Sequence, residues 1–299
     1  MRLFWSLFIL LWSSSLIGQT RITVIDSVTS KPIPYAHIVY GSNQGMYSNE
    51  DGIVVLPKDV SSIEISHISY ESISLNLHDY SDSSIRLTPV ITMLPPAIVR
   101  PTGQRTKRIG YAYDKWISTQ SGRNGCCIAQ FLNYPEGTSR SPIITGVSIN
   151  LNTVNLKRRM TVTVGDTTYV DGKMHVAKLR VDLRSLDPST GGPGESLING
   201  GVVYTLKDRA NLNIHKVHTI ALPQAPLFPS EGVFIVLEWI VTDDVRLQDM
   251  VSPSIWRARS SANGTSWIKW PLGKPWQKVN SNDPSREESV YCVGLDVIE

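Results

Sequence analysis

The chain has 299 residues, a formal net charge of +3 and three cysteines. Its length leaves room for two domains, each with its own hydrophobic core. The small positive excess is spread along the chain and does not form a basic footprint, so we exclude a nucleic-acid partner.

Residues 1–18 have the form of a secretory signal peptide. Met1 and Arg2 give a positive start, residues 3–12 are apolar, and small polar residues follow before Gln19. An apolar run of about 10 residues is too short to cross a bilayer core of about 30 Å. We therefore expect cleavage before Gln19, no integral membrane segment afterwards, and a protein that is periplasmic, outer-membrane-associated or extracellular.

Residues 19–100 carry the pattern of short strands. Apolar and polar residues alternate over 22–26 and 36–40, on either side of a turn, and this arrangement predicts a β-hairpin. Further short strands are predicted at 53–56, 63–68, 72–77 and 84–87, with an exit strand at 90–99. Since no helical period occurs, the region predicts a small antiparallel β-sandwich.

Four motifs in this region resemble the carboxypeptidase-like regulatory domain. They are VID at 24–26, KPIPYA at 31–36, SNEDG at 48–52 and ISHISY at 65–70, where Ser69 replaces the glycine that is usual in the family. The resemblance implies a transthyretin-like, carbohydrate-binding-like fold with no catalytic role. It also implies a secreted or outer-membrane protein of a Bacteroidetes-type bacterium.

Residues 101–108 predict a linker, because Pro96 and Pro101 exclude a helix interior and the following residues are polar. Residues 109–299 predict a second, larger, jelly-roll-like β-sandwich, since so many strands must stack as two sheets to bury their apolar faces. The strand-like segments are 126–132, 143–151, 160–164, 175–183, 201–204, 217–222, 233–241 and 290–297.

Three segments of the second domain have a weaker resemblance to a Bacteroidetes extracellular β-sandwich with no settled biochemical role. They are LRVDL at 179–183, GPGESL at 192–197 and GVFIVLEWI at 232–240. Between residues 245 and 289 the strand pattern breaks, and we expect a Trp-rich insertion there.

No histidine or acidic cluster has a convincing metal-ligand pattern. His215 and His218 are three residues apart, and in the predicted strand an odd offset sends them to opposite faces. Asp243, Asp244 and Asp249 contain the oxygen ligands that Ca²⁺ needs, but we expect them to be solvated. We therefore expect no metal ion and no cofactor.

Ser266 and Lys269 match the Ser-x-x-Lys spacing of some serine hydrolases. That motif needs a helix turn, which Gly264 and Pro271 on either side oppose. No other catalytic motif is found, so we expect no catalytic residue.

Glu238 is a carboxylate inside an apolar strand. Burying a charge without a partner is costly, so we expect this side chain to face outward or to form an ion pair with Arg180 or Arg257.

Four of the eight tryptophans lie in the expected insertion: Trp256, Trp267, Trp270 and Trp276. Exposed aromatic rings can stack on sugars or on apolar partner groups. A binding site requires at least two of them to be exposed near Lys269 or Lys274; otherwise they form a small core that holds the segment in place. Trp267 and Trp270 have an odd offset, so one should face inward and the other outward.

The three cysteines suggest a disulfide bond in an exported protein. Cys292 lies in the closing strand, and we expect it to pair with Cys126 or Cys127, although strand alternation does not decide between them. Three free, buried thiols are the alternative.

The sequence therefore favours a noncatalytic protein that binds or is displayed at the bacterial surface, with an unknown surface glycan or protein as its partner. A carbohydrate-binding module is one alternative. Another is a hydrolase, which would need two carboxylates about 5 to 10 Å apart in a cleft of the second domain.

Overall fold

The computed structural model describes residues 20–80, 82–90, 106–137, 142–152, 160–164, 167–171, 175–206, 216–247, 249–259, 265–271, 274–279 and 289–298. The predicted signal peptide, most of the exit strand and residues 101–105 of the predicted linker lie outside these ranges. Over the described ranges, no helix is long and apolar enough to span a membrane.

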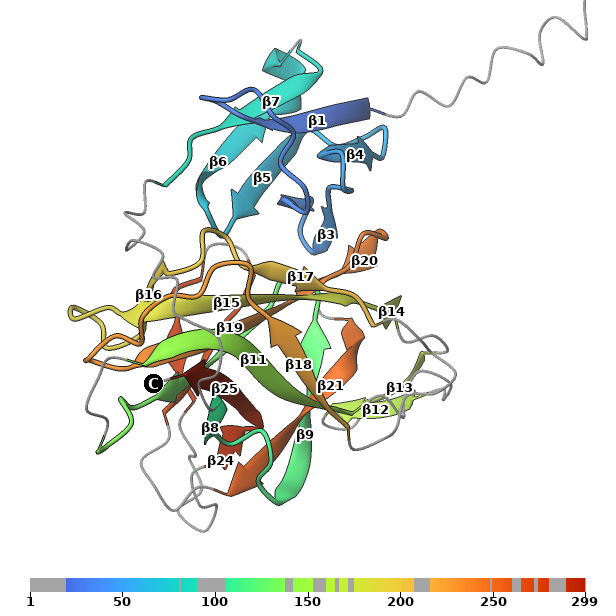
Figure 1. Ribbon diagram of the computed structural model, residues 1–299. Helices are drawn as coiled ribbons and strands as arrows, with labels where there is room; N and C mark the ends of the chain where they lie inside the picture. The colour runs from blue at the N-terminus through green and yellow to red at the C-terminus, as the bar shows by residue number, and fades with distance from the viewer. Residues whose placement is uncertain are drawn as a thin grey trace, which may run out of the picture.

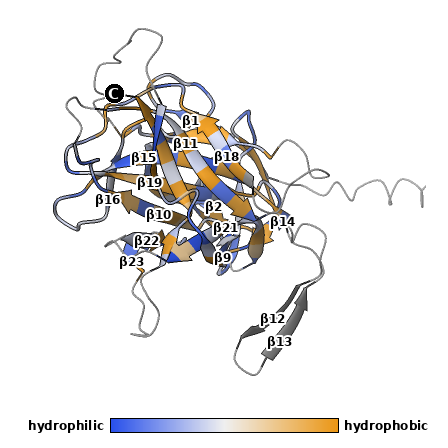
Figure 2. Ribbon diagram, turned by 60° about the horizontal axis from the view of Figure 1, so that its bottom comes forward, coloured by the Kyte–Doolittle hydropathy of each residue, from blue (hydrophilic) through white to orange (hydrophobic). Residues whose placement is uncertain are grey.

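The chain is all-β, as predicted, with a single 3-10 turn, η1 (Leu77–Asp79), in the part that the structure describes. Hydrophobic and hydrophilic residues alternate along strands such as β11 (Ile143–Asn152) and β18 (Lys216–Ala221) (Figure 2). This alternation gives each sheet one face for the core and one for solvent or for another sheet.

The first sandwich consists of a three-stranded sheet, β4-β1-β7, and a five-stranded sheet, β20-β3-β2-β5-β6. Its core includes Ile22, Val24, Ile38, Ile65 and Leu87. The strands are β1 (Thr20–Asp26), β2 (His37–Tyr40), β3 (Gln44–Tyr47), β4 (Ile53–Leu56), β5 (Ser62–His67), β6 (Tyr70–Asn76), β7 (Ser84–Leu87) and β20 (Val245–Arg246).

The predicted hairpin between residues 22–26 and 36–40 is wrong. β1 pairs with β4 and, in parallel, with β7, whereas β2 belongs to the opposite sheet. Asp26 accepts hydrogen bonds from the backbone N–H groups of Val28 and Thr29, and the chain then turns back against β1 at Ile33 before it crosses over. The alternation of apolar and polar residues predicted β1 and β2 correctly as strands, but it did not show that they lie in opposite sheets on either side of the first core.

The second sandwich lies below the first in Figure 1 and packs two large sheets around a core that includes Ile128, Val147, Leu183, Trp239 and Leu295. We call the seven-stranded sheet, β16-β15-β19-β10-β22-β23 with β17 on β15, the interface sheet. The eight-stranded sheet, β14-β21-β11-β25-β8 with β18, β24 and β9, is the far sheet.

The bounds of the remaining strands are β8 (Thr106–Gly110), β9 (Trp116–Arg123), β10 (Cys127–Leu132), β12 (Met160–Val164), β13 (Thr167–Asp171), β14 (His175–Val176), β15 (Lys178–Leu186), β16 (Pro193–Ser196), β17 (Val202–Tyr204), β19 (Val233–Ile240), β21 (Met250–Arg259), β22 (Ser266–Lys269), β23 (Gln277–Lys278), β24 (Ser289–Tyr291) and β25 (Val293–Ile298). β12 and β13 pair with each other as a separate two-stranded sheet.

Two expectations about chain organisation need correction. The end of the predicted linker, residues 106–108, begins β8, which pairs with β25. The expected insertion at 245–289 supplies integral strands. β21 pairs with four strands of the far sheet, of which β9 is one, and β22 pairs with β10 in the interface sheet. The irregular register of β21 around Pro253 interrupts the period-two pattern and explains why the sequence did not predict this strand.

Candidate functional site

The outer face of the five-stranded sheet rests on the interface sheet. Ile38 and Ile65 point into the first core, so their strand neighbours His37, Glu64 and Ser66 point the other way, toward the second sandwich. Figure 1 shows β3 and β20 at this junction, above β15 and β17. The second sandwich therefore covers the outer face of the five-stranded sheet.

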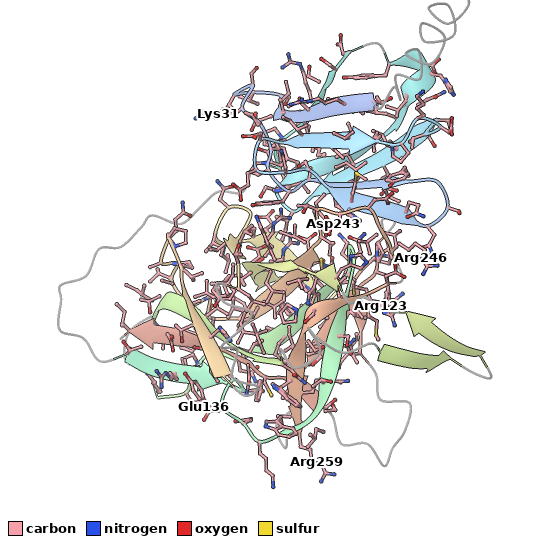
Figure 3. The ribbon with its side chains drawn as sticks, turned by 90° about the vertical axis from the view of Figure 1, so that its right-hand side faces the viewer. Lys31, Arg123, Glu136, Asp243, Arg246 and Arg259 are labelled. Atoms are coloured by element: carbon pink, nitrogen blue, oxygen red, sulfur yellow. The ribbon has the colours of Figure 1, made fainter. Side chains whose placement is uncertain are left out.

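A strand from the second sandwich completes the first. β20 adds to the edge of β3, with Val245 opposite Gly45, and the amide of Asn124 donates to the carbonyl oxygens of both residues at 2.9 and 2.7 Å. Arg246 and the neighbouring Asp243 lie at this junction in Figure 3. The two sandwiches are thus joined by backbone pairing as well as by side chains.

A buried ion pair forms the centre of the junction. Arg180, one of the two partners that the sequence left open, donates to Glu238 at 2.7 Å, and its other terminal nitrogen donates to the carbonyl oxygen of Tyr35 at 2.9 Å. The hydroxyl of Tyr47 donates to the second oxygen of Glu238 at 2.8 Å. Each oxygen of this carboxylate therefore accepts a hydrogen bond, and the positive charge of Arg180 compensates its charge.

The register of the interface sheet aligns four polar side chains across its outer face. Glu238 lies between Arg180 on β15 and Cys127 on β10, and Lys269 on β22 lies opposite Cys127. The first sandwich covers the Arg180 end of this row. The Lys269 end stands beside a cavity.

A cavity of about 220 Å³ lies between the two sandwiches beside this row. Its volume is below the range of about 300 to 1,000 Å³ that is typical for drug-sized ligands, so it suits a small molecule or one unit of a larger one. The first sandwich lines it with His37, Glu64, Ser66, His67, Ile68, Tyr70 and Ser72. The second lines it with Gly125, Cys127, Arg184, Val236, Glu238, Lys269, Trp270, Pro271 and Trp276.

The charged groups that line the cavity balance one another. Two are acidic, Glu64 and Glu238, and two are basic, Arg184 and Lys269. Glu238 is held as described, and Arg184 donates to Asp182 and to the carbonyl oxygens of Gly194 and Ile68. Glu64 and Lys269 have no side-chain partner among the described residues, so one free carboxylate and one free ammonium group lie on opposite walls.

The two lining histidines are neutral at physiological pH. Burial lowers the pKa of His37 to about 4, an effect that the charge of Glu238 partly opposes. Burial also holds the pKa of His67 well below 6.5, and the positive charge of Arg180 acts in the same direction. The Nδ1 atom of His67 accepts from the backbone N–H of Ser69, so the remaining proton is on Nε2, which makes this atom a donor.

Gly125 allows the close approach of the two sandwiches at the cavity. Its φ is +73°, a conformation that favours glycine. A Cβ atom there would lie 2.4 Å from His37 and 3.1 Å from Pro271. Both of those residues line the cavity, so a larger residue would displace its walls.

The four predicted tryptophans divide into two pairs. Trp256 and Trp267 are 7% and 9% exposed and pack in two small clusters on the outer faces of the far sheet and the interface sheet. Trp270 is 38% exposed and Trp276 is half-buried, and both line the cavity together with Lys269. The structure therefore corrects the proposed ligand-binding set: Trp256 and Trp267 belong to the packing of the fold.

Other predicted site residues lie elsewhere. Lys274 is exposed but does not line the cavity. The hydroxyl of Ser266 is buried and donates to Gln130, away from the ammonium group of Lys269. The Ser-x-x-Lys spacing therefore does not bring a nucleophile to a base.

The disulfide prediction also needs correction, because Cys126, Cys127 and Cys292 are all free thiols. Cys127 lies on the outer face of the interface sheet, whereas Cys292 packs against Trp256 on the outer face of the far sheet. The main core separates these two faces.

Two of the three acidic residues that were considered for Ca²⁺ have other partners. Asp244 accepts from the hydroxyl of Tyr40, and Asp249 pairs with Arg246. His215 lies outside the described residues, and the Nδ1 atom of His218 is 2.9 Å from the hydroxyl of Tyr204. Within the described ranges, no group of three potential metal ligands occurs.

No family model, curated protein or solved structure matches the chain. The geometry of the cavity is therefore the basis for assigning a function.

Sequence patterns found part of this site but not its location. Trp270, Trp276 and Lys269 were identified, whereas Glu64, His67 and Arg184 were missed. Alternation along β5 shows that Glu64 and Ser66 leave the first core, and this signal was present in the sequence. It does not show that a second sheet stands opposite them.

Proposed function

We propose that the protein is a noncatalytic binding protein that holds a neutral sugar unit in the cavity between its two sandwiches. The observation that carries this proposal is the set of side chains on the cavity walls. Trp270 and Trp276 lie on the same wall as the ammonium group of Lys269, and the carboxylate of Glu64 lies on the opposite wall; neither charged group has a side-chain partner among the described residues. An aromatic ring offers a face to the C–H groups of a sugar ring. The charged groups can accept from and donate to its hydroxyls.

The balance of charge favours a neutral ligand over a strongly acidic or basic one. An anion close to Lys269 would also lie in the field of Glu64 and Glu238. A hydroxyl group both donates and accepts, so a single neutral ligand can satisfy Glu64, Lys269, the Nε2–H group of His67 and the serine hydroxyls together.

The arrangement of the carboxylates supports binding rather than hydrolysis. A glycosidase uses two carboxylic groups, one as an acid and one as a base or nucleophile. Of the two carboxylates that line the cavity, Glu238 is committed to the contact between the sandwiches, where it pairs with Arg180 and accepts from Tyr47, and only Glu64 has no side-chain partner among the described residues. Catalysis by a pair of carboxylates is therefore disfavoured.

The proposal includes export and display at the surface of a Bacteroidetes-type cell, with the first sandwich as a carboxypeptidase-like regulatory domain. The support is the signal-peptide form of residues 1–18 and the four family-like motifs. Mass spectrometry of the mature protein should find Gln19, or a residue close to it, at the N-terminus. An intact Met1 would rule out cleavage.

A saccharide array followed by calorimetric titration tests the binding site. We expect wild-type protein to bind a neutral saccharide, and Trp270→Ala or Trp276→Ala to weaken that binding by at least about tenfold, as loss of an aromatic anchor usually does. Trp116→Ala is the matched control, because Trp116 is 41% exposed but does not line the cavity.

Three results would count against the proposal. These are the absence of any bound saccharide, equal binding by all three variants, and release of saccharide fragments during incubation. The last result would favour a hydrolase.

A further inference from the structure

Tyr47 connects the contact between the sandwiches to the walls of the cavity. It lies on β3 in the first sandwich, points toward the second and is 2% exposed. Its hydroxyl donates to Glu238, and its ring stacks on that of His37 with centroids 4.7 Å apart. Both partners line the cavity, but Tyr47 does not.

The hydrogen bonds around Glu238 connect the two sandwiches at two points. Tyr47 of the first sandwich and Arg180 of the second each donate to one oxygen of this carboxylate. Arg180 in turn donates to the carbonyl oxygen of Tyr35 in the first sandwich. Tyr35, Tyr47 and Ile240 pack together around this network, so the groups have little freedom to move separately.

From this geometry we infer that Tyr47 is a positioning residue for ligand binding: it sets Glu238 and His37 in the cavity wall and so couples sugar affinity to the docking of the two sandwiches. The inference rests on the proposed function for its ligand, but the geometric role can be measured without one. Because each sandwich supplies one wall, any shift of their contact changes the distance across the cavity.

A matched pair of variants separates this role from a general contribution to docking. Tyr47→Phe removes the hydroxyl that reaches Glu238 but keeps the ring against His37. Tyr40→Phe removes a second interdomain tyrosine hydroxyl, the one that donates to Asp244, and neither of those residues lines the cavity. Each variant loses one hydrogen bond from a tyrosine of the first sandwich to a carboxylate of the second.

The first readout is affinity for the saccharide that the array selects. We expect Tyr47→Phe to weaken binding at least about fivefold, the lower end of typical coupling between sites. The affinity of Tyr40→Phe should stay within about twofold of wild type, although its loss of thermal stability should be similar to that of Tyr47→Phe. Equal affinities for the two variants would overturn the inference.

The second readout needs no ligand and uses the thiol of Cys127, which lines the cavity and is half-buried, whereas Cys126 and Cys292 are buried. Maleimide labelling, assigned by peptide mapping, should be faster at Cys127 in Tyr47→Phe than in wild type and unchanged in Tyr40→Phe. If no saccharide binds, the proposed function fails while labelling still decides the role of Tyr47. Unchanged labelling in Tyr47→Phe would overturn that role.

Discussion

At the scale of single residues, two tryptophans three positions apart have different roles. Trp267 packs against Phe234, with ring centroids 6.4 Å apart, in a small cluster that also includes Ala129 and Val236. Trp270 follows the end of β22 and lines the cavity. The odd offset of this pair in the sequence does not explain the division, because Trp267 lies on the outer face of the interface sheet and Trp270 lies beyond the end of the strand.

We expect Trp267→Ala to lower the free energy of unfolding by about 3 to 5 kcal/mol, since it removes a large side chain from a packed cluster. Trp270→Ala should change it by less than about 1 kcal/mol. Urea unfolding of both variants measures the difference. Similar losses for the two would mean that Trp270 is also a packing residue.

The buried histidine at the cavity predicts a dependence of stability on pH. The pKa of His37 is about 4 in the folded protein and 6.5 as an ordinary value, so below pH 6.5 the unfolded chain binds more protons. Stability should therefore be complete above about pH 6.5 and fall as the pH drops toward 4, by at most roughly 3 kcal/mol from this residue. His67 acts in the same direction.

Urea unfolding at a series of pH values between 4 and 7.5 tests this effect for wild type and His37→Gln. The variant should show a shallower decline over that interval, whatever its stability at pH 7.5. Parallel curves for the two proteins would show that His37 does not carry the dependence.

At the scale of elements, β20 joins the sandwiches because β3 leaves room for it. Gly45 faces the junction, and a Cβ atom there would lie 2.6 Å from Leu247 and 3.1 Å from His37. Gly45→Ala should therefore lower the free energy of unfolding by about 1 to 3 kcal/mol through overpacking. Val28→Ala, at a 76% exposed turn position, is the control and should cost no more than about 0.5 kcal/mol.

Calorimetry or urea unfolding measures the free energy of unfolding of Gly45→Ala and of the control, Val28→Ala. If Gly45→Ala is as stable as Val28→Ala, the contact between β3 and Leu247 is looser than described, and the docking of the two sandwiches would need another explanation.

The individual strands of this protein were largely predictable, whereas their pairing was not. Segments such as 143–151 and 233–241 form strands as expected, because they are long runs rich in β-branched and other apolar residues. Alternation carries no information about the partner strand. The false hairpin at β1 and β2 follows from this limit, whereas β21 was missed because its irregular register interrupts the alternation itself.

At the scale of the whole molecule, the cavity exists because two domains meet, and this contact was beyond sequence reasoning. Tyr47 and Glu238 are 191 residues apart in the chain, and no local pattern relates them. An ion pair was one of the outcomes expected for Glu238, since a buried charge needs a partner, but the choice of Arg180 follows from the pairing of β15 with β19. The tyrosine that completes it comes from the other sandwich.

The central claim is that a sugar unit lies between the two sandwiches and contacts both. Hydrogen–deuterium exchange of the wild-type protein, with and without the saccharide that the array selects, tests it most directly. We predict that binding slows exchange in both walls at once, in β5 and β6 of the first sandwich and at Lys269, Trp270 and Trp276 of the second. Slower exchange in only one sandwich, or at a site away from the cavity, would contradict the claim.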